Sequence, residues 1–83
     1  MMYKARVEVG LRSGHSDPEG ETTARSLIEL GYCVKSVAVS KIYLIILEAD
    51  SEEEAKTNLE DMCRRLLANP TKDHYTFQVE TAK

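Results

Sequence analysis

The chain has 83 residues, of which 42% are hydrophobic and 30% charged, and its formal net charge is −3. This length predicts one domain over residues 1–83, because a second hydrophobic core would not fit. The acidic balance argues against nucleic-acid binding, which needs a basic face, and no apolar run approaches the roughly 20 residues of a membrane span. The N-terminus alternates charged and apolar residues and is not a signal peptide, so we expect a cytoplasmic protein with no nucleic-acid or membrane partner.

The first third of the chain predicts a strand followed by a helix. Residues 3–12 alternate apolar and charged side chains, which indicates a strand with one buried face. Asp17-Pro18 then starts a helix, because Asp caps free backbone N–H groups and Pro suits the first helical position. We expect Gly31 in the left-handed conformation just past the end of this helix. Gly20, within the first turn, is unfavourable for a helix and indicates that another backbone approaches closely.

Two strands are predicted in the middle of the chain, over residues 34–39 and 42–47. Ser40-Lys41 is short enough to join them as a hairpin, although it lacks the Asn-Gly signature. Residues 42–47 are apolar on both faces, so one face can pack on helices while the other needs a cover. We therefore expect self-association, as a dimer or tetramer, through residues 42–47. The residues of this region expected at a partner or oligomer interface are Lys41, Ile42, Tyr43, Leu44 and Ile45.

The last third predicts a helix and a final strand. Ser51 and Glu54 form a capping box, and apolar residues recur at helical spacing until Asn69-Pro70 ends the helix. Residues 74–80 alternate as a strand. The order strand, helix, strand, strand, helix, strand predicts an α+β class. The expected architecture is a two-layer, ferredoxin-like βαββαβ fold, with two helices on one face of an antiparallel sheet.

The polar residues form no convincing catalytic or metal-binding set. The acidic run 52–54 is explained by helix capping and the helix dipole. Neighbouring loop residues such as His15 and Asp17 rarely have catalytic geometry. A zinc site would need two histidines and two cysteines whose spacing matches no zinc pattern, and we expect both thiols to be buried. The prediction is a binding or assembly subunit with no catalytic, cofactor-binding or metal-binding residue; the residues of the rejected zinc site are His15, Cys33, Cys63 and His74.

An ordered set of motifs runs through the chain: Tyr3–Val7, Asp17-Pro18-Glu19-Gly20, Leu30-Gly31-Tyr32, Lys41, Ala49–Ala55 and Met62–Pro70. With this set the chain resembles the PurS family, the small subunit of phosphoribosylformylglycinamidine synthase, over essentially its whole length. The chain departs from the family pattern in three ways. His15-Ser16 stands where an apolar pair is usual, and Ser40 stands where Gly is usual. The strand predicted over residues 42–47 is also unusually apolar.

The resemblance implies a non-catalytic subunit of a ligase in de novo purine (IMP) biosynthesis. That enzyme makes formylglycinamidine ribonucleotide from formylglycinamide ribonucleotide, ATP and glutamine. A large synthetase subunit (PurL) binds ATP and magnesium, and a glutaminase subunit (PurQ) releases ammonia from glutamine. The small subunit binds no cofactor, bridges the other two and aids ammonia transfer. The residues expected to face these partners lie in the loop 14–17 and at the end of the second helix: His15, Asp17, Pro18, Leu67, Asn69 and Pro70.

Two other functions remain open from the residues alone. The first is a ferredoxin-like regulatory module that binds a small metabolite at a dimer interface. Such a module needs a concave pocket with converging polar groups, and nothing in the sequence points to one. The second is a small phosphatase of the same fold.

Overall fold

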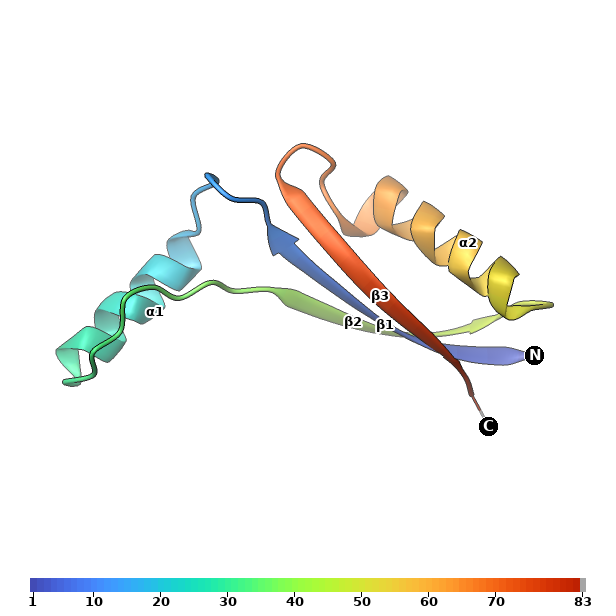
Figure 1. Ribbon diagram of the computed structural model, residues 1–83, viewed down its shortest axis with the longest axis horizontal. Helices are drawn as coiled ribbons and strands as arrows, with labels where there is room; N and C mark the ends of the chain where they lie inside the picture. Colours follow the sequence, from blue (N-terminus) through green and yellow to red (C-terminus); the bar gives the residue numbers. More distant parts are fainter. Residues whose placement is uncertain (83) are drawn as a thin grey trace.

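The fold is known from a computed structural model that describes residues 1–82. It is α+β, with a three-stranded antiparallel sheet in the order β2-β1-β3 (Figure 1). The predicted ferredoxin-like class is confirmed. The elements are β1 (Met2–Leu11), α1 (Pro18–Glu29), β2 (Lys41–Glu48), α2 (Glu52–Met62), a π-helical turn η1 (Cys63–Leu67) and β3 (Asp73–Thr81).

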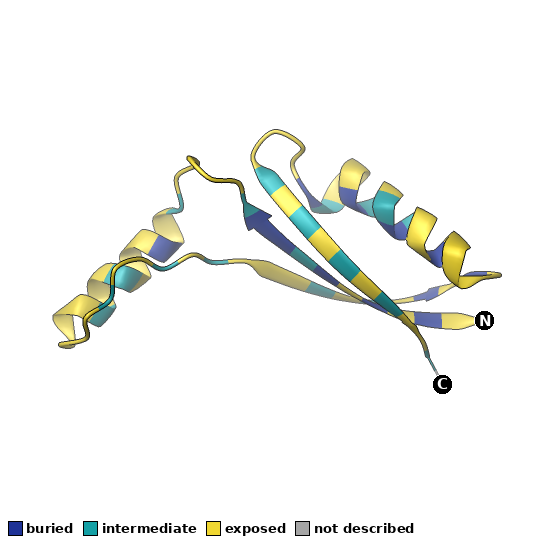
Figure 2. Ribbon diagram, viewed as in Figure 1, coloured by how far each residue is buried: buried dark blue, intermediate teal, exposed yellow. Residues whose placement is uncertain are grey.

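The hydrophobic core lies between the sheet and α2. β1 is the central strand, and its alternating apolar residues are buried on the face that α2 covers, while its charged residues face outward (Figure 2). From α2 and η1, Leu59 and Cys63 are fully buried against this face. The core is thin because one helix covers one face of the sheet. Its buried members are Tyr3, Ala5, Val7, Val9, Leu47, Ala49, Ala55, Leu59, Cys63 and Ala68.

Both ends of α1 form as the sequence predicts. The Asp17 carboxylate accepts a hydrogen bond from the Gly20 N–H at 2.9 Å, and Pro18 is the first helical residue. Gly31 has a φ of +101°. The N–H groups of Gly31 and Tyr32 donate to the carbonyls of Ile28 and Leu27, which is the Schellman arrangement. The close approach at Gly20 is also confirmed, since a Cβ there would overlap the carbonyl oxygen of Val37.

The middle of the chain differs from the prediction. Residues 32–40 form no strand, and Ser40-Lys41 makes no hairpin turn. The segment turns back at the end of α1, passes along this helix and continues into β2. α1 lies beyond the end of the sheet, so the expected pair of helices on one face is reduced to α2 (Figure 1). The physical reason lies in the turn residues. Neither Ser40 nor Lys41 adopts the positive φ that a two-residue hairpin turn requires.

Within residues 1–82, no helix is both long enough and apolar enough to cross a membrane.

Candidate functional site

The cysteines and histidines considered as zinc ligands do not form a site. Among residues 1–82, no three His, Cys, Asp or Glu side chains are grouped so that they could hold a metal ion. Cys63 is buried as predicted, but Cys33 is exposed, because it lies in the segment after α1 that no sheet covers. Burial, helped by the nearby Glu60 carboxylate, raises the pKa of the Cys63 thiol and keeps it in the unreactive protonated form.

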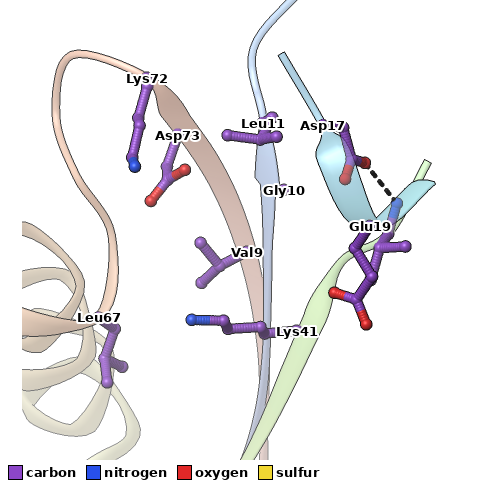
Figure 3. Close-up of a pocket in the computed structure, with 10 residues that line it drawn as sticks. Val9, Gly10, Leu11, Asp17, Glu19, Lys41, Leu67, Lys72 and Asp73 are labelled. Carbon is purple, nitrogen blue, oxygen red and sulfur yellow. Dashed lines mark hydrogen bonds between the residues drawn. The ribbon is translucent and has the colours of Figure 1, made fainter. Parts of the chain in front are cut away.

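A cavity of about 220 Å³, lined by both charged and apolar residues, lies where β1 ends and β2 begins. Three predicted contact residues line it: Asp17, Lys41 and Leu67. Figure 3 shows the Lys41 side chain lying across β1 near Val9, between Leu67 and the α1 side of the cavity. His15 lines a neighbouring cavity, together with Asp17 and His74. The structure therefore gathers the predicted loop 14–17, the start of β2 and the end of η1 at one end of the sheet.

The chemistry of this cavity suits a protein contact. Its volume lies below the roughly 300–1,000 Å³ of small-molecule sites. Lys41 and Lys72 form no ion pair within residues 1–82, while the Asp73 carboxylate accepts the Asn69 N–H at 2.8 Å. Exposed charges of both signs around a small hollow are typical of the polar rim of an interface. The sequence did not point to Glu19, Lys72 and Asp73 as lining residues, because nothing local links a helix start to a turn far along the chain.

Three predicted contact residues have local structural roles. The Asn69 side chain accepts hydrogen bonds from the N–H groups of Thr71 and Lys72, at 2.9 and 3.3 Å, and so holds the turn before β3. Pro70 follows in the same turn, after η1 has ended. Pro18 opens α1. Their contacts with partner subunits remain a prediction.

The face of the sheet opposite α2 carries an uncovered apolar row on β2. Ile42, Leu44 and Ile46 are 43%, 70% and 59% exposed. On β1 they lie opposite Glu8, Arg6 and Lys4 in turn, so the apolar row runs beside a charged row. Tyr43 and Ile45 point to the α2 face and are half-buried. We call Ile42, Leu44, Ile46 and the neighbouring charged row of β1 the open face.

A second group of polar contacts ties α2 and η1 to β3. The Tyr75 hydroxyl donates to the Glu60 carboxylate at 2.6 Å, and an Arg64 Nη lies 3.2 Å from the same oxygen. The Tyr75 hydrogen bond lowers the pKa of Glu60, and the same bond raises the pKa of Tyr75. The predicted pair of Glu60 and Arg64 therefore helps to hold α2 and η1 against β3.

The hydrogen bonds of Asp17 predict that the folded chain loses stability at acid pH. Hydrogen bonds from the Gly20 and Val39 N–H groups, each 2.9 Å long, hold its pKa below the ordinary value of 3.8. Because the folded-state pKa is the lower one, the contribution is fully present above the unfolded pKa and is lost as the pH falls through the folded pKa. Urea unfolding midpoints measured from about pH 6 to about pH 2 should fall less steeply for Asp17→Asn than for the parent chain. Glu21→Gln, on the exposed side of α1, is the control, and an equal slope for the parent and Asp17→Asn would contradict the assignment.

Comparisons with known proteins agree on one family. Residues 4–81 match the family model described as PurS, phosphoribosylformylglycinamidine (FGAM) synthase. The chain is 45% identical over 80 residues to the phosphoribosylformylglycinamidine synthase subunit PurS of Methanocaldococcus jannaschii, covering 95% of this chain and 96% of the relative. The crystal structure of M. jannaschii PurS superposes with a TM-score of 0.86 at 43% identity, over 98% and 99% of the two chains. A chain in the structure of PurLQS from Thermotoga maritima gives 0.86 at 32% identity, over 96% and 99%.

Proposed function

Because the chain belongs to the PurS family of phosphoribosylformylglycinamidine synthase subunits, we propose that it bridges the synthetase and glutaminase subunits of that enzyme and aids ammonia transfer between them. The observation that carries the proposal is the end of the sheet, where Asp17, Lys41 and Leu67 line one cavity among exposed charges of both signs. Such a mixture of charges suits the polar rim of a protein interface. The T. maritima PurLQS structure supports the proposal, since it contains a chain similar to this one.

The proposed role follows from the chemistry of ammonia. Ammonia released from glutamine into bulk water would be diluted and protonated, and the ammonium ion has no free lone pair with which to attack. A rigid adaptor that holds two active sites together raises the effective concentration of the intermediate at the second site. The adaptor needs no catalytic group for this. ATP, magnesium and glutamine are then used by the partner subunits, and this subunit binds no cofactor of its own.

We assign different partners to the two surfaces. The end of the sheet around His15, Asp17, Lys41 and Leu67 contacts the synthetase or glutaminase subunit, because its mixed charges suit a polar interface. The open face stacks on the same face of a second copy. Its charged row carries both signs, so a copy related by a two-fold axis can place Lys4 and Arg6 near the acidic side chains of its mate. In this proposal the chain works as one domain in the cytoplasm.

Reconstitution tests the proposed role. The chain is mixed with the synthetase and glutaminase subunits from the same source, and product formation is followed with glutamine or with ammonium salt as the nitrogen donor. We expect omission of the chain to lower the glutamine-dependent rate about tenfold or more, because coupling is lost. The ammonia-dependent rate should stay unchanged. Equal glutamine-dependent rates with and without the chain, and no complex on a sizing column, would overturn the proposal.

Two charge-reversal variants test which surface of the chain this assay depends on. Lys41→Glu changes the cavity at the end of the sheet and should lower the glutamine-dependent rate. Lys56→Glu makes the same change on the exposed surface of α2, away from that cavity, and should leave the rate unchanged. Equal glutamine-dependent rates for the two variants would mean that the cavity at the end of the sheet is not part of the interface.

A further inference from the structure

The second helix ends in a π-helical turn that carries a leucine out of the apolar stripe. Ala55 and Leu59 of α2 are buried, and the helical spacing of apolar residues continues through Leu66. Seven residues of a regular α-helix bring a side chain back to within about 20° of its starting direction. In a regular helix Leu66 would therefore point the same way as Leu59. Leu59 is fully buried, whereas Leu66 is 82% exposed.

The wider turn, and not the end of the core, exposes this leucine. The Ala68 N–H donates to the Cys63 carbonyl, five residues back, at 2.9 Å. A Schellman helix end also contains a bond of this span, but it needs a residue with positive φ, and η1 contains none. Cys63 and Ala68, on either side of Leu66, are both buried in the core. The core therefore continues past the turn, and Leu66 points away from it.

A single exposed leucine needs no explanation by itself, but two further observations concern Leu66. No other large apolar side chain among residues 1–82 is as exposed, and it is exposed by a π turn, which is rare and often found at functional sites. Its neighbour Leu67 lines the cavity at the end of the sheet (Figure 3), which the proposed function assigns to a partner subunit. Leu66 therefore extends that contact surface onto η1.

The surface around this turn carries positive charge without counter-charges. The carboxylates of Asp17 and Asp73 each accept hydrogen bonds from backbone N–H groups, which compensate their charge. Glu19 is the one other carboxylate that lines the cavity. Four exposed cations lie on η1 and at this end of the sheet, and within residues 1–82 they form no ion pair: Arg12, Lys41, Arg65 and Lys72. A chain with a formal net charge of −3 thus keeps a positive surface at this end.

We propose that Leu66 is the apolar anchor with which this chain binds the glutaminase subunit, an inference that rests on the proposed function. The π turn holds Leu66 away from its own core, so that the side chain can enter an apolar pocket of the partner. The four cations then lie at the rim of the contact and face carboxylates of the glutaminase. An apolar anchor inside a polar rim of complementary charge is the usual anatomy of a protein interface.

Charge selects the glutaminase from the two proposed partners. The synthetase uses ATP, and a site that takes up a polyanion is surrounded by positive potential. Such a surface would repel the four cations at this end of the chain. Glutamine carries no net charge, so its uptake does not require a positive surface on the glutaminase. The cations therefore fit an acidic rim on the glutaminase better than the surface of the synthetase.

Titration of the chain into fixed amounts of synthetase and glutaminase tests the anchor. The measured quantity is the chain concentration that gives half of the maximal glutamine-dependent rate. We expect Leu66→Ala to raise it about tenfold, because truncation of an interface anchor costs at least this much. Leu66→Met keeps the apolar volume and should stay within about twofold of the parent chain. An equal concentration for the parent and Leu66→Ala would overturn the anchor and leave the bridging role standing, whereas no stimulation by the parent chain would overturn both.

A photo-cross-linker at position 66 identifies the partner. Leu66→Cys is made in a Cys33→Ser chain, in which the remaining Cys63 is buried, and is labelled with a benzophenone maleimide. On illumination of the three-subunit mixture, we expect a covalent product with the glutaminase. The same label at Lys56→Cys, on the exposed surface of α2, should give none. A product with the synthetase or a second copy instead, or no product from position 66, would overturn the assignment to the glutaminase.

Discussion

Truncating Leu59 to alanine is expected to lower the free energy of unfolding by about 3 kcal/mol, within the range for buried leucines. Leu59 is fully buried and is among the largest fully buried side chains of a core that a single helix covers. A domain of this kind has about 5–15 kcal/mol of total stability. The substitution should therefore remove a large fraction of it. Urea unfolding followed by circular dichroism gives the value, at one fixed protein concentration because self-association contributes to stability.

Leu66→Ala is the matched control for this prediction. Leu66 lies in η1, close to Leu59 in sequence, but is 82% exposed. Its truncation should change the free energy of unfolding by no more than about 0.5 kcal/mol. Equal losses of unfolding free energy for the two variants would mean that Leu59 does not pack in the core.

Local sequence patterns were sufficient to predict both helices and the three strands that form the sheet. The alternation along residues 3–12 predicted β1 and its buried face, and the helical spacing after Ser51 predicted α2 and its buried stripe. Capping at Asp17 and the left-handed Gly31 were also predictable, because each depends on a few neighbouring residues. The close approach at Gly20 was predicted as well, although its partner, Val37, was not.

The position of α1 and of the segment after it, residues 32–40, could not be predicted in the same way. An apolar stripe such as that of Ala24, Leu27 and Ile28 shows that a helix needs a partner surface, but not whether its own chain provides it. The same limit applies to Val34, Val37 and Val39, whose pattern favours a strand whichever sheet it joins. The sequence did contain one indication against a hairpin, because Ser40-Lys41 lacks the residues that favour a two-residue turn. Cys33 was predicted to be buried for the same reason. It follows α1, which was expected to pack on the sheet, and it is exposed.

The candidate site was predicted in part. Loop position and helix ends pointed to His15, Asp17 and Leu67, and the structure brings these near Lys41 at one end of the sheet. Glu19, Lys72 and Asp73 lie at the same place but carry no local signal. Only the antiparallel pairing of β1 with β3 brings the turn before β3 alongside the end of β1.

Replacing Leu44 by glutamate is expected to halve the mass of the assembled particle. Leu44 is the most exposed apolar residue of the open face and lies opposite Arg6 on β1. Ile45 would be a poorer probe, because it points to the α2 face and a charge there would disturb the core. Enclosing a glutamate between two apolar rows costs about 3 kcal/mol or more, which weakens association about 100-fold or more. Sedimentation velocity over a range of protein concentrations measures the change.

The matched control, Leu66→Glu, separates the open face from exposed leucines in general. Leu66 is more exposed than Leu44 but lies on η1, away from β2. The same added charge there should leave the mass unchanged, and Leu66→Glu should unfold at a urea concentration close to that of the parent chain. A particle of full mass from Leu44→Glu would show that the apolar row of β2 is not covered by a second copy.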